Sequence, residues 1–313
     1  MDKKNLLLYL EIPFCPVRCR HCVRAERAPA LEYRQAYLEA LRREVQASAG
    51  SMPDYGVQAV WVGGGIAGHM ADGSLGELLR QLPRWFCLSK EAEITLKVHP
   101  GMVGAETLKA CRLGGVNRLS VEYVTHNIFE HECLGRFLNP QAMDVTQMVL
   151  SDSKIARSFD LIVGLPGQTR TSLRESLEAA LDYGAVHIAL YPMELYENTK
   201  LWREWRQDPE ILRRNLRKRL PDGPEKKALW EEAASFLEER GLQEYLPGQW
   251  AFPGSKCRYR ELEAVKTECL AFGLGAVSTV EGVRSVNTRD MERYLRCSCE
   301  PEQIVCSIEP FMV

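Results

Sequence analysis

The sequence lacks any apolar run of the roughly 18 residues that a membrane-spanning helix needs. It also lacks a signal peptide, because residues 1–4 lead straight into a short strand-like run. No excess of positive charge is present, since 40 Lys and Arg face 42 Asp and Glu for a formal net charge of -2. We therefore expect a globular cytoplasmic protein that has neither a membrane nor a nucleic acid as its partner.

Cysteine is the residue type that stands out in the composition. Eleven cysteines in 313 residues would suggest disulfides in a small secreted domain. In a chain of this length without a secretion signal, they indicate metal binding or free thiols instead. Their spacing therefore has to decide between these uses.

The first two thirds of the chain alternate between strand-like and helix-like patterns. Apolar, β-branched runs alternate with stretches of helical periodicity, and this order predicts parallel strands joined by crossover helices. Six such units predict an α/β fold, a partial (β/α)6 barrel, with a small C-terminal α+β extension. The expected strands are 6–12, 57–62, 94–98, 116–121, 159–163 and 187–191, and the expected helices are 33–45, 75–85, 105–113, 142–150 and 172–183.

The pattern changes after the sixth expected strand. Residues 197–223 are dense in Arg, Asp and Pro and carry no long apolar period, which indicates a surface connection or lid. A strong helix is expected over 224–240, then a Gly-rich pair of short strands within 271–283 and a last helix around 289–295. The predicted organisation is a barrel over 1–197, a linker or lid over 198–223 and an extension over 224–313.

Three cysteines stand close together in the segment LYLEIPFCPVRCRHC. Cys15, Cys19 and Cys22 follow the first expected strand directly, at the end where α/β folds keep their ligand sites. Three thiolates on one loop can bind three irons of a [4Fe-4S] cluster and leave the fourth iron open to a cofactor. A zinc site is the alternative, but it needs a fourth ligand nearby, and His21 is badly placed for it.

The spacing C-x3-C-x2-C after a first strand resembles the radical S-adenosylmethionine (SAM) superfamily. In that superfamily the amino and carboxylate groups of SAM chelate the open iron, and an injected electron cleaves the sulfonium to give a 5′-deoxyadenosyl radical. The resemblance thus implies a [4Fe-4S] cluster and one or two molecules of SAM as cofactors. Gly63, Gly64 and Gly65 in VWVGGGIAGHM end the second expected strand, where side-chain-free backbone could approach the methionine end of SAM.

Further motifs resemble one branch of that superfamily, the oxygen-independent coproporphyrinogen III oxidases with their haem-chaperone and class C methyltransferase relatives. The motifs include EITLKVHPG, GVNRLSVE, FDLIVGLPGQT and HIALYPMELYENTKL, and the resemblance covers nearly the whole chain. It implies that Asp160 holds the ribose of SAM, that Arg136 contacts the cofactor and that Tyr191 lines the barrel mouth as a catalytic residue. Structural roles are the alternatives, namely a strand-end cap, a surface ion pair and a core residue. A carboxylate inside an apolar strand is costly unless it is paired, which favours a function for Asp160.

Three positions depart from the pattern of this branch. Lys97 stands where the branch usually has a SAM-contacting glutamate, and Val124 stands where it usually has a glutamine. Lys97 could hold a carboxylate of the substrate or cofactor as a point charge, or it could only extend to the rim of the barrel. His21 replaces an aromatic residue before the third cysteine, and it either titrates near the cluster or stacks as that ring does, of which we expect stacking.

The tail departs from the branch as well. The segment RYRELEA after Cys257 lacks the histidine and aromatic pair of the haem-chaperone motif, so haem trafficking is disfavoured, and the N-terminal extension of the oxidase is missing. Cys297, Cys299 and Cys306 form a second group, which could bind a metal with Cys257 or Cys269 or could serve as a thiol relay.

The resulting hypothesis is a radical SAM enzyme that methylates or otherwise modifies a specialised small molecule, with class C methyltransferases as the nearest functional model. Its electron donor would be a protein such as flavodoxin or ferredoxin. The alternative is a non-catalytic haem or tetrapyrrole carrier that retains the cluster-binding fold, or a tetrapyrrole-modifying oxidoreductase. Release of deoxyadenosine distinguishes an enzyme from a carrier.

Overall fold

The structure is a computed structural model that describes residues 3–15, 18–23, 30–70, 73–136, 143–144, 146–148, 154–207 and 219–310. One curved sheet of twelve strands runs through it in the order β12-β11-β10-β9-β1-β2-β3-β4-β5-β6-β8-β7. Strands β1 to β6 are neighbours in chain order, and each pairs with the next in parallel. The predicted α/β class and the partial barrel of six parallel strands are therefore confirmed.

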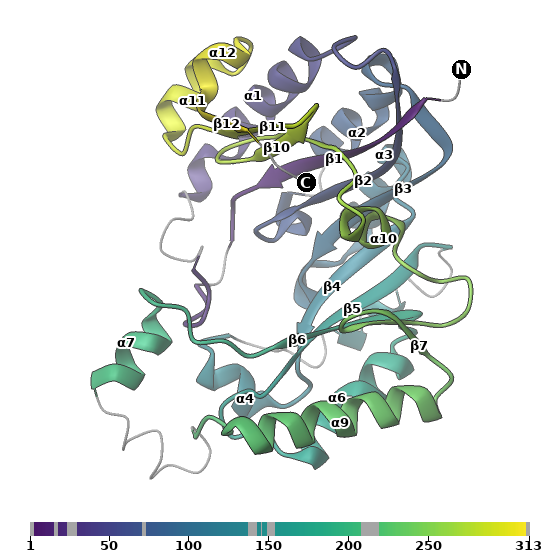
Figure 1. Ribbon diagram of the computed structural model, residues 1–313, viewed down its shortest axis with the longest axis vertical. Coiled ribbons are helices and arrows are strands. Elements are labelled where there is room, and N and C mark those ends of the chain that lie inside the picture. The colour runs from purple at the N-terminus through teal and green to yellow at the C-terminus, as the bar shows by residue number, and fades with distance from the viewer. Residues whose placement is uncertain are drawn as a thin grey trace.

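Most of the helices cover the convex face of this curved sheet (Figure 1). Their apolar sides and the strands share one large core, in which Tyr37, Leu41, Leu79 and Leu177 are at most 2% exposed. Burial of this kind contributes roughly 25 cal/mol per Å² of apolar surface, and it is the main reason that the barrel layer holds together. Among the described residues no helix combines the length and the apolar character that crossing a membrane requires.

The elements match most of the expected ranges and extend them by a few residues. Helix α7 is an addition, because it forms in the segment that the sequence predicted as an irregular connection, and much of the expected helix 142–150 lies outside the described residues. The strands are β1 (Lys4–Ile12), β2 (Tyr55–Gly64), β3 (Leu88–Val98), β4 (Arg118–Val124), β5 (Ala156–Val163), β6 (His187–Pro192), β7 (Gln243–Leu246), β8 (Gln249–Ala251), β9 (Cys269–Phe272), β10 (Val277–Val280), β11 (Val283–Asn287) and β12 (Val305–Pro310). The helices are α1 (Arg34–Ala47), α2 (Gly73–Trp85), α3 (Ala105–Gly114), α4 (Ile128–Cys133), α6 (Arg170–Asp182), α7 (Lys200–Gln207), α9 (Gly223–Glu239), α10 (Arg258–Ala264), α11 (Met291–Cys297) and α12 (Pro301–Ile304).

Local sequence explains where the two longest late helices begin. Helix α6 starts at a capping box, in which the side chain of Thr169 accepts from the Ser172 amide and the Ser172 side chain accepts from the Thr169 amide. Helix α9 has the same arrangement between Asp222 and Glu225, with a proline in its first turn. Each box satisfies two amides that would otherwise lack partners at a helix start.

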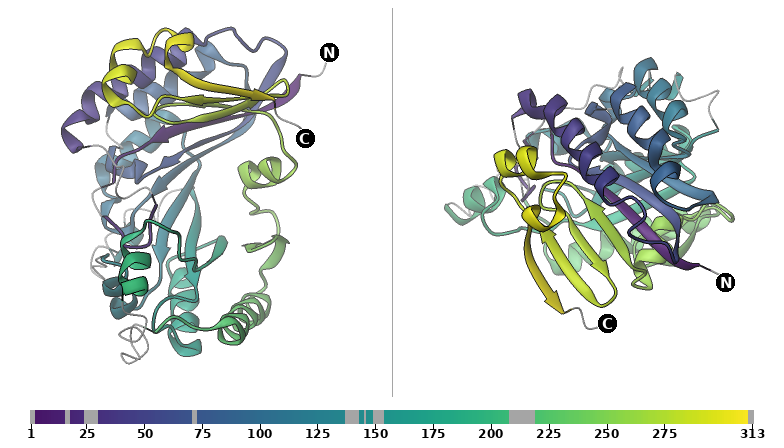
Figure 2. Two further views of the ribbon diagram at one scale, coloured as in Figure 1. Left: turned by 60° about the vertical axis from the view of Figure 1, so that its left-hand side comes forward. Right: turned by 90° about the horizontal axis from the view of Figure 1, so that it is seen from above.

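The C-terminal third adds strands to both edges of the barrel sheet. Strand β9 pairs in parallel with β1, and β10 to β12 continue antiparallel from it, whereas β8 and β7 pair antiparallel beyond β6. The tail therefore shares one sheet with the barrel, and the division into barrel, linker and extension stays a proposal. Between β8 and β9 the chain crosses the open side of the curved sheet, and α10 lies in this crossing (Figure 2, left).

A buried carboxylate joins the extension to the barrel helices. The Oε2 atom of Glu44, on α1, accepts from Tyr294 Oη at 2.6 Å and from the Gly273 amide at 2.9 Å. Its Oε1 atom accepts from Asn287 Nδ2 at 2.7 Å. Burial nevertheless dominates, and it raises the pKa of Glu44 from 4.5 to about 7.

This raised pKa predicts a loss of stability as the pH rises. The folded protein holds the Glu44 proton more tightly than the unfolded chain does, so the stabilisation is complete below pH 4.5 and is lost as the pH passes 7. The loss amounts to roughly 3 kcal/mol from the size of the shift. In thermal unfolding between about pH 5 and pH 8, we expect the Tm of Glu44→Gln to fall less than that of the natural chain. The exposed Glu238→Gln should follow the natural chain, and an identical pH response of all three proteins would contradict the assignment.

Candidate functional site

The loop that carries the three cysteines is fixed to the end of β1. Phe14 is fully buried, and its ring packs edge-on against Tyr37 at 5.2 Å between centroids. Its carbonyl accepts from the Ile66 amide at 2.9 Å, and the Ile12 carbonyl accepts from the Gly65 amide at 2.6 Å. The start of the loop is thereby held against the backbone that follows β2.

The far end of the loop is held by two other segments. The Arg20 amide donates to the Leu134 carbonyl at 2.8 Å, and the Arg20 carbonyl accepts from the Leu201 amide at 2.8 Å. Cys19 is buried, while Cys15 and Cys22 are partly exposed. The loop therefore presents three thiols near the carboxyl ends of the barrel strands.

The donor set suits a cubane cluster better than a single ion. Among the described residues no group of three or more His, Cys, Asp or Glu has the arrangement of a metal-ion site. In a [4Fe-4S] cluster each thiolate binds its own iron, so the three sulfur atoms need not converge on one point. Three thiols on one anchored loop fit that requirement.

The glycine run has a tightly packed surrounding. A Cβ atom on Gly64 would lie 1.9 Å from Glu11 Oε1, and Gly64 also has a φ of +98°. A Cβ on Gly65 would lie 2.3 Å from the Phe14 carbonyl, and one on Gly63 would lie 2.4 Å from Trp61 Nε1. The positive φ of Gly64 and the Phe14 carbonyl beside Gly65 thus already require glycine at these two positions, and contact of the three glycines with SAM stays a proposal.

Arg136 connects the cysteine loop to the barrel interior. Its Nη1 atom donates to Cys19 Sγ at 3.3 Å and to Glu122 Oε1 at 3.0 Å, and its Nη2 atom donates to the Glu122 carbonyl at 3.1 Å. The Arg136 side chain is 1% exposed, so the surface ion pair considered from the sequence is not what forms. Burial raises the pKa of the Cys19 thiol to about 11, and the guanidinium of Arg136 partly offsets this because it stabilises negative charge on the sulfur.

Glu122 is a site residue that the sequence reasoning missed. It lies on β4 with Arg136 on one side and Lys97 on the other, and Lys97 Nζ is 3.6 Å from Glu122 Oε2. Burial opposes ionisation of Glu122, but the charges of Lys97 and Arg136 outweigh it and lower the pKa to about 2. The signal was available, because Glu122 stands inside an apolar strand just as Asp160 does.

Lys97 and Asp160 face the barrel interior beside this pair. Asp160 Oδ2 accepts from Ser120 Oγ at 2.9 Å and lies 4.0 Å from Lys97 Nζ. Burial raises the pKa of Asp160, although Lys97 and Arg260 partly offset it. Lys97 therefore already has two carboxylate neighbours, in place of the free position at the rim that the sequence allowed.

Two further predicted positions have clear surroundings. His21 is partly exposed, but its Nδ1 atom is buried without a hydrogen-bond partner, and desolvation lowers the pKa of the ring to about 4, so the ring is neutral at pH 7. Val124 is buried with a φ of +72°, a region that a β-branched residue rarely adopts. It packs with Leu134, Leu165 and Met193, so it has no polar contact to offer a cofactor.

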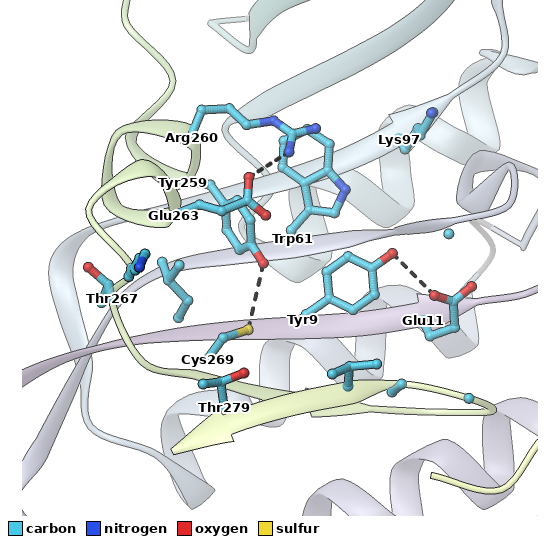
Figure 3. A pocket seen from close by; sticks show the side chains of 16 residues that line it. Tyr9, Glu11, Trp61, Lys97, Tyr259, Arg260, Glu263, Thr267, Cys269 and Thr279 are labelled. Carbon is cyan, nitrogen blue, oxygen red and sulfur yellow. Dashed lines mark hydrogen bonds and ion pairs between the residues drawn. The ribbon is translucent and has the colours of Figure 1, made fainter. Parts of the chain in front are cut away.

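A cavity of about 600 Å³ lies beside these residues, on the open side of the barrel (Figure 3). Gly64 and Lys97 line its end near the cysteine loop, while Trp61 and Arg260 line its middle. Tyr191 borders it indirectly, because Arg260 Nη2 lies 3.4 Å from Tyr191 Oη. The barrel strands and α10 thus enclose a space large enough for a small organic ligand.

The cysteines of the C-terminal third do not lie on one loop as Cys15, Cys19 and Cys22 do. Cys297 is buried, and Cys299 and Cys306 are exposed. Cys257 lies instead against Glu93, with 3.2 Å between Sγ and Oε1, and Cys269 lies beside Tyr259 in the cavity wall. In the part of the chain that the structure describes, these thiols form no metal-ion site.

Comparison with known proteins supports the resemblance seen in the motifs. No family model matches the chain. An anaerobilin synthase of Escherichia coli O157:H7 is 27% identical over 93% of this chain and 64% of its own length, and a heme chaperone HemW of Haemophilus influenzae is 26% identical over 93% of this chain and 76% of its own. The chain thus spans less than two thirds of the anaerobilin synthase. The structure of Escherichia coli coproporphyrinogen III oxidase, described as a radical SAM enzyme, matches the whole chain with a TM-score of 0.80 at 20% identity, which confirms the fold.

Proposed function

We propose that this chain, a radical SAM protein of the coproporphyrinogen oxidase-like branch, is an enzyme that holds a [4Fe-4S] cluster through Cys15, Cys19 and Cys22. The observation that carries the proposal is Arg136, which joins the sulfur of Cys19 to the charged residues in the barrel interior. A cluster of this kind supplies the electron for reductive cleavage of the SAM sulfonium. The donor would be a cytoplasmic flavodoxin or ferredoxin.

The charged residues around Arg136 suit the polar groups of SAM. Lys97 offers an ammonium for a carboxylate, and Glu122 offers a carboxylate for an amino group, so the two strands together present both charges that an amino acid requires. Asp160 is oriented by Ser120 and could accept hydrogen bonds from ribose hydroxyls. The imidazole of His21 is neutral at pH 7, which suits packing against a ring. Tyr191 would complete the wall on the substrate side.

For the substrate we propose a tetrapyrrole or a similarly flat conjugated molecule, which the enzyme modifies through the radical. The relatives named for anaerobilin synthesis and heme binding point to this class. The aromatic side chains of Tyr9, Trp61 and Tyr259 line the cavity and offer surfaces for such a molecule. Methyl transfer of the class C type is the second candidate reaction on the same substrate.

A non-catalytic heme carrier is the competing proposal, and the cavity argues against it. None of the described residues that line the cavity is a histidine or a methionine, the usual protein ligands of heme iron besides cysteinate and tyrosinate. Cys269 and the tyrosines are the remaining candidates, and Cys269 Sγ and Tyr259 Oη already form a hydrogen bond with each other at 3.7 Å. We therefore expect only weak heme binding.

The test is an anaerobic reaction of the reconstituted chain with SAM and a strong reductant, with and without protoporphyrin IX or coproporphyrinogen III. We expect release of 5′-deoxyadenosine, and a changed mass of the tetrapyrrole when it is present. SAM with a labelled methyl group separates the two reactions, because only methyl transfer moves the label to the product. A protein that keeps its cluster, binds heme stoichiometrically and never cleaves SAM would instead be a carrier.

A further inference from the structure

Three cations line the cavity, Lys97, Arg260 and Lys266, and Arg260 is distinguished by its contact with an aromatic ring. The guanidinium of Arg260, from α10, lies over the ring of Trp61, from β2, with 4.4 Å to the ring centroid (Figure 3). Contact with an indole ring holds a guanidinium in place, and the N–H groups at the edge of the guanidinium can still donate in the plane of the guanidinium itself. Arg260 is thus a preoriented donor that faces the cavity.

The present partners of Arg260 use only part of its capacity. Nη1 donates to Glu263 Oε2 at 2.7 Å, and Nη2 donates to Tyr191 Oη at 3.4 Å, whereas a guanidinium has five N–H donors. Glu263 stands one helical turn from Arg260, and its side chain is 49% exposed. Exposed pairs of this kind contribute little to stability, so Glu263 can move into solvent when a better acceptor arrives.

The rest of the wall indicates what that acceptor is attached to. The Trp61 and Tyr259 rings lie 5.3 Å apart between centroids, and Tyr9 lines the same space. Tyr9 Oη donates to Glu11 Oε2 at 3.2 Å, so the carboxylate of Glu11 already has a hydrogen-bond donor within the wall. Aromatic surfaces beside a stacked guanidinium suit a flat, conjugated molecule that bears a carboxylate.

We infer that Arg260 determines substrate specificity by binding a carboxylate of a flat conjugated substrate, and that Glu263 occupies this position until the substrate replaces it. The inference rests on the proposed function for the reaction, and it adds the group of the substrate that is recognised and the residue that recognises it. The same α10 segment was noted in the sequence only for lacking the haem-chaperone motif. The structure shows that Arg260 and Glu263 stand there instead.

Binding of two probe pairs to the reconstituted full-length chain tests the inference. Protoporphyrin IX is titrated by absorbance, and 2-naphthoate is compared with 2-naphthamide by quenching of tryptophan fluorescence. For Arg260→Gln we expect about tenfold to hundredfold weaker binding of both carboxylates and no change for the amide, since a charged hydrogen bond is lost. Arg260→Lys should bind with intermediate affinity because it keeps the charge but not the planar fork, and Glu263→Gln should bind the carboxylates severalfold more tightly.

Arg258→Gln is the matched control, because it removes the same charge from the same helix. Arg258 contacts Gln58 and the Glu91 carbonyl and does not line the cavity. The variant Arg258→Gln should therefore bind every probe with the affinity of the natural chain. The inference is overturned if the natural chain does not prefer naphthoate to naphthamide, or if Arg260→Gln retains that preference. If the natural chain does not bind porphyrin but still prefers naphthoate through Arg260, only the proposal of a tetrapyrrole substrate is rejected, and the role of Arg260 stands. Iron and sulfide contents of Arg260→Gln that equal those of the natural chain are the expected sign that the cluster loop is intact.

Discussion

Replacement of Cys19 by serine abolishes the iron-sulfur cluster and with it the cleavage of SAM. A serine hydroxyl is a poor iron ligand beside two thiolates, and Cys19 is the buried member of the three, next to the guanidinium of Arg136. We expect less than about a tenth of the iron and sulfide of the natural chain after anaerobic reconstitution, and no detectable 5′-deoxyadenosine. Iron and sulfide analysis with the visible absorption spectrum measures the first effect, and chromatography measures the second.

The other cysteines provide matched controls for this result. Cys87→Ser and Cys299→Ser remove exposed thiols outside the loop, and both should keep the full iron content and activity. Cys15→Ser and Cys22→Ser should behave like Cys19→Ser. Loss of iron in Cys299→Ser together with normal iron in Cys19→Ser would move the cluster to the tail and refute the proposal.

Replacement of Glu122 by glutamine is the change with the largest expected effect on stability. The variant leaves the buried charge of Arg136 and the charge of Lys97 without their shared carboxylate. Removal of one partner from a buried network costs roughly 3 kcal/mol, which corresponds to about 6 °C in Tm for a chain of this size. Thermal unfolding of the variant and the natural chain under identical anaerobic conditions measures the difference.

A second substitution separates lost pairing from a general disturbance. Lys97→Met alone should lower the free energy of unfolding by less than Glu122→Gln does, because Glu122 keeps its ion pair with Arg136 and the lysine charge is removed. The double variant Glu122→Gln with Lys97→Met should recover part of the loss, roughly 1 kcal/mol, since Arg136 is then the one cation that has lost the Glu122 carboxylate. Glu106→Gln, which removes a carboxylate from an exposed pair with Lys109, is the control and should be neutral. Strictly additive losses would show that Lys97 and Glu122 do not interact.

The barrel strands and the cysteine loop could be predicted because their signals are local. Six apolar runs with helical stretches between them are enough to give the order of β1 to β6, since parallel neighbours need crossover helices. The cysteine spacing follows directly after the first run. These features depend on residues that are close in sequence, and the expected ranges came within a few residues of the observed ones.

The surroundings of the site could not be predicted in the same way. The contact between Arg260 and Trp61 joins α10 to β2, and no local pattern specifies such a pairing. The strands β7 to β12 are short, and their assignment to the two edges of the barrel sheet depends on partners distant in sequence. The strained backbone of Val124 is a third case, because no feature of the residues next to it in the sequence predicts a positive φ.

The crossing between β8 and β9 has a mechanical consequence. The terminal strands of the curved sheet are β7 and β12, and in the described residues they do not pair with each other, so no ladder of backbone hydrogen bonds closes the gap between the two halves. The contacts that hold the crossing to the strands lie outside the strand ladders: the Arg258 and Tyr259 amides donate to Glu93, and Arg118 donates to the Ser255 and Lys256 carbonyls. The aperture can widen by release of these contacts while every strand pair stays intact. A rigid guest too broad for the gap at rest could thus pass sideways into the interior without local unfolding of the sheet.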